Sequence, residues 1–386
     1  MRASLAVKDG FGVWLPLLQT YEISTLSTDV LLRGTLRGDL DPGAPDVLAA
    51  IEEWGRPVHF RDDPDGLEVA LVMPGETPPT RWWLHALLFA ATIVTTLGAG
   101  ALLAGVDPFR TRMAEWGALA VPYPTRLRWS GLAAGVSFAA PFLGVLLAHE
   151  MGHWVAARRH GIRASLPYFI PFPPYFSIIG TVGAFIRLRG ATIRRAHLFD
   201  VGASGPLVSF ALSLPLLAVG LSMSEVVGGY VSAATPFAVT FAGTPVWLGN
   251  GLLLRVLTWL FAPEAGSLAG PLMLHPVAFA GWLGLFVTAL NLLPVGQLDG
   301  GHVLYAMLGP HQHRIGRLFL LALIPLGLRW WGWWAWAALV AYLHRGRVGH
   351  PRVVQPQPPV GRTRTVVGWL VIVIFFLTFV PVPLSL

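Results

Sequence analysis

The stretch LLAHEMGHWVAARRHG, residues 146–161, places His149, Glu150 and His153 at the end of a long apolar run. Ionisable side chains within membrane spans cost at least about 2.5 kcal/mol each at the bilayer centre, and they usually mark function. Two histidines four residues apart lie on the same face of a helix, so their rings can bind one metal ion. The stretch therefore predicts a membrane helix that carries a metal site.

The composition of the whole chain is typical of a membrane protein. Of its 386 residues, 54% are hydrophobic and only 12% are charged, whereas about a quarter are charged in soluble proteins. The formal net charge of +7 comes almost wholly from arginines between apolar runs, where orientation in the bilayer explains them better than nucleic acid does. We therefore expect no nucleic-acid partner. Because the chain has no cysteine, any metal must be held by His, Asp or Glu.

Apolar segments of the length needed to cross the hydrocarbon core, roughly 20 residues, follow one another along most of the chain. They are residues 82–106, 129–157, 198–221, 277–295, 317–343 and 366–384. The fifth segment is either one tilted span or a hairpin of two short spans broken at Leu328 and Arg329. The fold class that we expect is a polytopic all-α membrane protein with six or seven transmembrane helices.

Residues 1–75 differ from the rest, because they carry most of the acidic residues and no run long enough to span a bilayer. Residues 29–40 favour a strand, residues 44–55 a helix, and residues 58–73 two strands around the turn-forming DPDG. A small soluble α/β domain is therefore expected first. The expected division is a soluble domain at 1–75, a linker at 76–80, a transmembrane core that carries the metal site at 81–310 and C-terminal transmembrane helices at 311–386.

Arginine-rich loops set the predicted orientation, since cytoplasmic loops carry the excess of positive charge. Clusters follow the second span, precede the third and precede the last, and we place all three in the cytoplasm together with the soluble domain. The loop at 107–128 does not fit this orientation, because it holds Arg110, Arg112, Arg126 and Arg128 on the side where few arginines are expected. We expect an integral protein of a prokaryotic cytoplasmic membrane, with its site towards the cytoplasmic side.

The segment between the second and third spans, residues 164–190, is apolar and aromatic yet dense in proline and glycine. It cannot form a regular helix. Irregular or strand-like backbone at membrane depth is tolerated only where protein or a water-filled cavity satisfies its polar groups. We therefore expect a re-entrant, β-like segment beside a cavity. The alternative is an aromatic loop that lies at headgroup level.

The HExxH spacing in the opening stretch is the signature of zinc peptidases. Zinc lowers the pKa of a bound water towards 7, and the glutamate, here Glu150, takes the proton. A catalytic zinc typically has three protein ligands. The best candidate for the third is Asp299 in NLLPVGQLDGGH, residues 291–302, at the predicted cytoplasmic end of the fourth span. His302, three residues later, is the rival ligand.

Together these motifs resemble the site-2 protease family of intramembrane metalloproteases. Members pair HExxH on one transmembrane helix with Asn-x-x-Pro-x-x-x-Leu-Asp-Gly on another, and HEMGH (149–153) and NLLPVGQLDG (291–300) match both in order and register. The resemblance implies Glu150 as general base and acid, and Asn291 and Pro294 as residues that shape the active-site cleft. The implied ligands of one Zn²⁺ per chain are His149, His153 and Asp299.

The third span adds a further match. GASGPLVSF, residues 202–210, resembles a family motif that loosens a core helix near the site, with Gly202, Gly205 and Pro206 in place. Ser209 stands where many members have an asparagine. Residues 165–187 fall where members carry a membrane-inserted β-hairpin that holds the substrate as an extended strand. The soluble module and the absence of room for a PDZ domain look most like the chloroplast and cyanobacterial-type branch.

The leading hypothesis is an intramembrane zinc endopeptidase that hydrolyses a peptide bond in or near a transmembrane segment of a membrane-protein substrate. Its expected partners are that substrate and the lipid bilayer. A metal or proton transporter could use the same His/Asp cluster, but transporters often show internal repeats, and we find none here. An inactive relative that only binds transmembrane segments is a third possibility, and Glu150 argues against it because binding needs no base.

Overall fold

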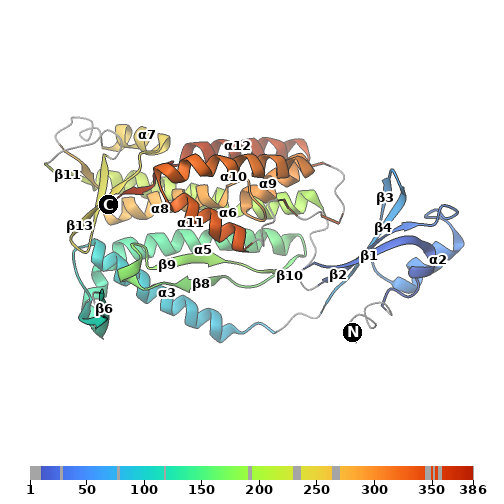
Figure 1. Ribbon diagram of the computed structural model, residues 1–386, viewed down its shortest axis with the longest axis horizontal. Helices are drawn as coiled ribbons and strands as arrows, with labels where there is room; N and C mark the ends of the chain where they lie inside the picture. The colour runs from blue at the N-terminus through green and yellow to red at the C-terminus, as the bar shows by residue number, and fades with distance from the viewer. Residues whose placement is uncertain are drawn as a thin grey trace.

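The computed structural model shows a bundle of helices with a β-sheet at each end of its long axis (Figure 1). It describes residues 10–26, 29–75, 79–116, 119–189, 194–228, 236–262, 270–343, 349–350, 353–354 and 359–385. Part of the predicted linker, residues 76–78, lies outside the described residues, as do Arg345, Arg347 and Arg352 of the last arginine cluster. The described chain is mostly helical, so the predicted class is confirmed in this coarse form.

The N-terminal part is a four-stranded antiparallel sheet in the order β1-β2-β4-β3. The predicted strand, helix and hairpin are all present, but β1 was not predicted. It is an edge strand with the mixed sequence LQTYEISTL, which lacks the clean alternation of a half-buried strand. The bounds are β1 Leu18–Leu26, β2 Asp29–Leu36, α2 Pro45–Trp54, β3 Val58–Asp63 and β4 Gly66–Met73.

Three segments among the described helices are long and apolar enough to cross a membrane. They are α3 (Trp82–Leu103), the run Trp129–Arg159 that ends in α5 (Val136–Arg159), and α6 (Arg195–Ser222). These correspond to the first three predicted spans. The fourth, α8 (Pro276–Asn291), has 16 residues. The total of six or seven spans therefore stays a prediction.

The long fifth segment is divided into two helices, α10 (Gln312–Arg329) and α11 (Gly332–Leu343). The break follows Arg329, close to the point at which the sequence allows a hairpin. Trp334 donates from Nε1 to the carbonyl of Ile324, at 3.1 Å, which ties the two helices together. The last helix is α12 (Arg362–Thr378).

Glycines bring the central helices α5, α6 and α8 into close contact. A Cβ added at Gly152 on α5 would lie 3.0 Å from the carbonyl oxygen of Ser204 on α6, and one at Gly281 on α8 would overlap the backbone of Leu217. Small residues at helix crossings let backbones approach, which is how membrane helices associate where lipid weakens the hydrophobic effect. The resulting tight crossing of α5 and α6 holds the candidate site.

A β-hairpin of β8 (Tyr168–Pro171) and β9 (Thr181–Phe185) runs beside α3 and α5 (Figure 1). The ring of Tyr168 lies 4.0 Å from that of His85 near the start of α3. Gly180 packs so closely on the Thr95 carbonyl that an added Cβ would overlap it. The hairpin thus follows α3 for ten residues, or about 15 Å. The predicted β-like conformation is present, while membrane depth remains a proposal.

Strands elsewhere depart from the expected all-α membrane part. β5 (Phe109–Trp116) and β6 (Leu119–Leu127) form a hairpin, and a five-stranded sheet in the order β11-β14-β12-β13-β15 lies at the end of the bundle opposite the N-terminal sheet (Figure 1). The bounds are β11 Glu225–Val226, β12 Phe237–Phe241, β13 Thr244–Leu248, β14 Leu272–Met273 and β15 Leu384–Ser385, with α7 at Leu252–Phe261.

Candidate metal centre

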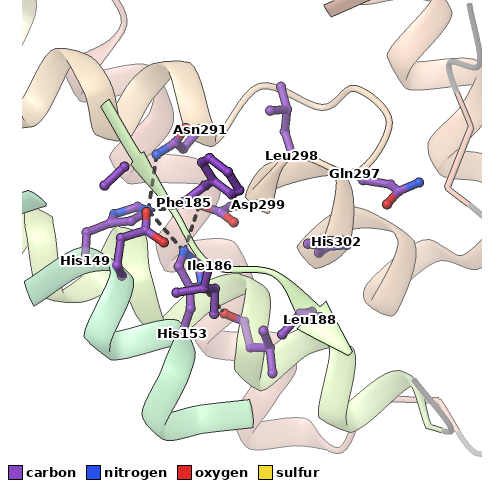
Figure 2. A pocket seen from close by; sticks show the side chains of 13 residues that line it. His149, His153, Phe185, Ile186, Leu188, Asn291, Gln297, Leu298, Asp299 and His302 are labelled. Atoms are coloured by element: carbon purple, nitrogen blue, oxygen red, sulfur yellow. Dashed lines mark hydrogen bonds and ion pairs between the residues drawn. The ribbon is translucent and has the colours of Figure 1, made fainter. Parts of the chain in front are cut away.

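Two helices from distant parts of the sequence bring three candidate ligands together (Figure 2). His149 and His153 lie one turn apart on α5, and both are buried. Asp299 is the first residue of α9 (Asp299–Leu308), and its side chain is 15% exposed. Within the described part of the chain, these are the only three His, Asp or Glu side chains that form such a group.

The donor atoms of this His/His/Asp cluster form a nearly equilateral triangle. The two Nε2 atoms are 3.0 Å apart, and Oδ2 of Asp299 lies 3.3 Å from Nε2 of His149 and 3.2 Å from Nε2 of His153. A tetrahedral zinc ion with bonds of about 2.0–2.1 Å separates its ligands by roughly 3.3 Å. The donor set and its spacing therefore fit one zinc ion and leave a fourth position for water or substrate.

The second ring nitrogen of each histidine has a partner that sets the tautomer. Nδ1 of His153 lies 2.6 Å from the carbonyl oxygen of Val201. A carbonyl only accepts, so this nitrogen carries the proton and Nε2 is left with a free lone pair. An arrangement of this kind orients metal-binding histidines and raises their basicity.

His149 reaches the same tautomer through two hydroxyl groups. Its Nδ1 lies 3.1 Å from Oγ of Ser209, which lies 2.7 Å from Oγ1 of Thr288. Thr288 donates to the Gly284 carbonyl at 2.7 Å, so the hydroxyl proton of Ser209 goes either to Thr288 or to the Pro206 carbonyl, 3.2 Å away. In both cases Ser209 accepts from His149. Ser209 thus contacts the ring of His149 at the position where many family members have an asparagine.

A tight turn after α8 places Asp299 next to the two histidines. Pro294 has no N–H to continue the helix, and Gly296 adopts the left-handed conformation with φ of 55°. A Cβ at Gly300 or Gly301 would overlap the carbonyl groups of this turn. The Asp-Gly-Gly sequence therefore lets the first turn of α9 pack directly on the preceding loop.

Glu150 lies beside the cluster in a pocket of about 200 Å³. Its side chain is buried, with the residue 6% exposed, and it accepts a hydrogen bond from the backbone of Ile186, just after β9. The amide of Asn291 lies 3.2 Å from Nε2 of His149. The pocket is lined by His149, Glu150, His153, Ala184, Phe185, Ile186, Leu188, Val201, Asn291, Gln297, Leu298, Asp299 and His302 (Figure 2).

The remaining predicted residues shape the surroundings of the cluster. A Cβ at Gly205 would overlap the imidazole of His153, and one at Gly202 would press on His302 and α9. Pro206 lies inside α6 and cannot donate to the carbonyl of Gly202. The carbonyl of Pro294 accepts from Nε2 of Gln312 at 3.0 Å, which anchors the turn.

The rival ligand His302 lines the pocket but is outside the His/His/Asp cluster. Its Nδ1 lies 2.8 Å from Nε2 of His350. The geometry therefore favours Asp299 as the third donor. Two groups that hold the histidine tautomers were not expected from the sequence: the Val201 carbonyl on α6, which is the partner of His153, and Thr288 on α8, which contacts Ser209. Thr288 could have been noticed as a hydroxyl one turn before Asn291 in an apolar helix, whereas the Val201 carbonyl carries no side-chain signal.

Comparison with known proteins adds an independent finding. The model of peptidase family M50 matches residues 137–324, a range that contains the whole cluster. No solved structure matches the chain.

Several curated plant proteins are similar to the chain. The probable zinc metalloprotease EGY1, chloroplastic, of Arabidopsis thaliana is 30% identical over 262 residues, which cover 67% of this chain and 45% of that protein. Its namesake from Oryza sativa subsp. japonica is 31% identical over 239 residues, covering 61% and 39%. The probable zinc metalloprotease EGY2, chloroplastic, of Arabidopsis thaliana is 32% identical over 166 residues, covering 43% and 27%. The chain thus spans less than half the length of these relatives.

Proposed function

The chain belongs to peptidase family M50, the site-2 proteases, and on this premise we propose that it is an intramembrane zinc endopeptidase. It hydrolyses a peptide bond in or near a transmembrane segment of a membrane-protein substrate. The observation that carries the proposal is the triangle of two imidazole nitrogens and one carboxylate oxygen with Glu150 beside it. The two histidines and Glu150 lie on a helix long enough to cross a membrane.

His149, His153 and Asp299 would hold the zinc ion. The similarity to probable zinc metalloproteases supports zinc as the ion, and the spacing of the donors supports this ligand set. Bound zinc lowers the pKa of a coordinated water and polarises the peptide carbonyl. Both histidines present their Nε2 lone pairs to the ion because their Nδ1 protons are held by the backbone and by Ser209.

Glu150 would move the proton. Its carboxylate takes a proton from the attacking water and passes it to the amide nitrogen that leaves, as a general base and then a general acid. The Ile186 backbone hydrogen bond holds this carboxylate against the end of β9. The amide of Asn291, next to His149, is positioned to shape the cleft on the side of α8.

The edge of β9 would hold the substrate. Among the described strands, β9 pairs only with β8, and Ala184 and Phe185 at its end line the pocket. A helical substrate hides its peptide carbonyls in its own hydrogen bonds, whereas an added strand exposes them to the catalytic group. Since the hairpin follows α3 for about 15 Å, half the thickness of the hydrocarbon core, this pairing would occur at membrane depth.

The proposed setting is a prokaryotic cytoplasmic membrane, with the site towards the cytoplasm. Arg158 and Arg159 at the end of α5 support that orientation. We also propose the division into a soluble domain at 1–75, a linker at 76–80, a core at 81–310 and C-terminal helices at 311–386. The four-stranded sheet that ends at Met73 and the start of α3 at Trp82 support its first two boundaries.

The test is cleavage of membrane-spanning test substrates by the purified chain in detergent. We expect Glu150→Gln to retain zinc and to lower the cleavage rate by about 10²- to 10⁴-fold, and a zinc chelator to abolish cleavage. Glu225→Gln is the matched control, because this exposed glutamate lies on β11 at the far end of the bundle. Cleavage that survives both Glu150→Gln and the chelator would contradict the mechanism.

A further inference from the structure

A β-hairpin joins the first two membrane-spanning segments and carries a cluster of arginines that the metal centre does not use. Its strands are β5 and β6, between the end of α3 at Leu103 and the run that begins at Trp129. Both flanking segments are long and apolar enough to cross a membrane, so the hairpin between them lies at a membrane surface. The arginines on or next to it are Arg110, Arg112, Arg126 and Arg128.

Protein contacts fix the base of this hairpin. Phe109 packs against α3, because a Cβ added at Gly98 would lie 3.0 Å from its ring. Tyr175, in the turn of the β8–β9 hairpin, donates to the carboxylate of Asp107 at 2.6 Å, and Arg128 donates to the carbonyl of the same residue at 2.6 Å. From this base the hairpin crosses the direction of α5 rather than continuing along it (Figure 1). Because α5 spans the membrane, the hairpin extends along the membrane surface.

The pairing of the strands places two of the arginines on one face. Arg112 is the direct partner of Tyr123. Arg126 is the direct partner of Arg110, which precedes Arg112 by two positions. Direct partners lie on the same face, and so do residues two apart in a strand. The register skips Thr125, and this bulge turns Arg126 to the face of Tyr123. We call the face with Arg112, Tyr123 and Arg126 the basic face.

The basic face is left uncovered by the described part of the chain. Its three side chains are exposed, that of Tyr123 by 44%, and neither arginine has a hydrogen-bond or ion-pair partner among the described residues. Glu115 is also exposed, but it lies three positions from Arg112 and therefore on the opposite face. An isolated two-stranded hairpin is at best marginally stable in water, so a partner on the basic face would stabilise it.

The location and composition of the basic face favour phospholipid headgroups as that partner. Guanidinium groups bind phosphate oxygens through paired hydrogen bonds, and tyrosine and tryptophan rings lie at the level of the headgroups. Trp129, at the start of the second span and 70% exposed, indicates that the base of the hairpin is at that level. Anionic headgroups add a net attraction for each arginine near the surface. A second copy of the basic face would carry the same positive charge and be repelled.

We propose that the basic face lies on anionic phospholipid headgroups, in the leaflet opposite to the side of Arg158 and Arg159. The proposal rests on the membrane setting proposed above but not on the proteolytic activity, so the two can fail separately. It also accounts for the arginines of 107–128, which do not fit the predicted orientation. On a strand pair that runs along the headgroups, anionic lipid supplies their counter-charge.

The test uses the full-length chain in nanodiscs of phosphatidylcholine, with and without phosphatidylglycerol. Because the chain has no cysteine, a single one is introduced by Ala114→Cys or by Met113→Cys and labelled with a fluorophore. Ala114 lies two positions from Arg112 and so on the basic face, whereas Met113 lies on the opposite face. With phosphatidylglycerol present, a nitroxide on the lipid headgroup should quench the label at position 114 more strongly than the label at 113. Iodide in the water should do the reverse.

Removal of phosphatidylglycerol, or the double substitution Arg112→Gln with Arg126→Gln, should abolish this difference between the two labels. An arginine near an anionic surface favours binding by about fivefold, so the loss of two lowers the ratio of bound to free hairpin by roughly 25-fold. Arg37→Gln is the matched control, since the ion pair of Arg37 with Asp39 is exposed and lies in the N-terminal part. It should keep the difference. The zinc content of the double variant should equal that of the wild type and reports that it is folded.

Three results would overturn the proposal. Full quenching of the label at 114 by iodide in both kinds of disc would place the hairpin in water. Headgroup quenching that persists without phosphatidylglycerol, or in the double variant, would show that the arginines do not recognise anionic lipid. Protection of the label at 114 from both quenchers would show that a protein surface covers the basic face.

Discussion

Nδ1 of His149 lies 3.1 Å from the hydroxyl oxygen of Ser209, and this contact decides which nitrogen of the ring is free for a metal. The hydroxyl of Thr288 donates a hydrogen bond to the carbonyl of Gly284, and the hydroxyl of Ser209 donates either to Thr288, 2.7 Å away, or to the carbonyl of Pro206, 3.2 Å away. Either arrangement leaves Ser209 as an acceptor for the ring N–H. A neighbouring helix thereby holds the first ligand in the tautomer that zinc requires.

Ser209→Ala is therefore expected to weaken zinc binding by about 10- to 100-fold, the usual cost of losing a partner of a metal-binding histidine. Competition with a chromophoric chelator measures the affinity. Ser213→Ala is the matched control, because Ser213 is buried one turn further along α6 and its Oγ has no hydrogen-bond partner among the described residues. Equal zinc affinity in the two variants would show that the hydroxyl of Ser209 does not orient the ring.

Gly205→Ala is expected to displace the imidazole of His153, since the added methyl group would overlap this ring. A shift of about 1 Å in a reacting geometry can cost roughly 10²-fold in rate. Zinc content and cleavage should both fall. The methyl group added by Gly144→Ala on α5 meets nothing within 4 Å in the described part of the chain, so this variant should keep both its zinc and its cleavage activity. If Gly205→Ala cleaves and binds zinc as well as Gly144→Ala does, the close packing of α6 on His153 is not needed for zinc binding or cleavage.

The ion pair between Arg163 and Asp29 is expected to hold the N-terminal sheet against the membrane core. Asp29 has a side chain that is 8% exposed, while that of Arg163 is 42% exposed, so solvent screens the pair in part. We expect Arg163→Gln to lower the opening free energy of β2 by about 1 kcal/mol. Hydrogen exchange of the β2 amides measures this free energy.

The exposed pair of Arg37 with Asp39 supplies the control for that measurement. Arg37→Gln should leave the exchange of β2 unchanged. Asp29→Asn in the Arg163→Gln background should recover part of the loss, because it removes the charge left without its partner. Exchange rates that are the same in wild type and Arg163→Gln would mean that other contacts hold the sheet in place.

Burial lowers the pKa of His59 below its ordinary value of 6.5, and the positive charge of Arg194 lowers it further. The folded state thus binds its proton less readily than the unfolded state. This histidine supports the fold fully above about pH 6.5, and its contribution is lost as the pH falls from there towards the folded-state pKa. Exchange of the imidazole C2–H, followed by mass spectrometry, measures this pKa.

Arg194→Gln should raise the pKa of His59, whereas Arg37→Gln should not change it. A wild-type pKa at or above 6.5 would contradict the described surroundings of this ring.

The sequence predicts the three metal ligands better than the side chains that orient them. His149 and His153 are fixed by helical spacing, and Asp299 was preferred over His302 because charge counting and the second motif placed it at the same depth. Ser209 and Thr288 could not be paired in this way. They lie 79 positions apart, and a contact between two helices depends on how their small residues pack.

The fold was predictable where hydrophobic runs are long, as in α3, α5 and α6. Short strands were harder. The hairpin of β12 and β13 turns at Ala242 and Gly243, both with positive φ. Alternation of apolar and polar residues on both sides of such a two-residue turn indicates a hairpin, but the apolar composition of these strands hides the alternation. Pairings such as β14 with β12, or β15 with β13, join distant segments and leave no local pattern.

The zinc content of purified Asp299→Ala, measured beside that of His302→Ala, tests the central claim most directly. Both side chains line the same pocket, but only Asp299 lies within 3.3 Å of the two imidazole nitrogens. We predict that the wild type and His302→Ala each carry one zinc ion per chain and that Asp299→Ala loses it. Full zinc in Asp299→Ala together with its loss in His302→Ala would contradict the ligand set of His149, His153 and Asp299.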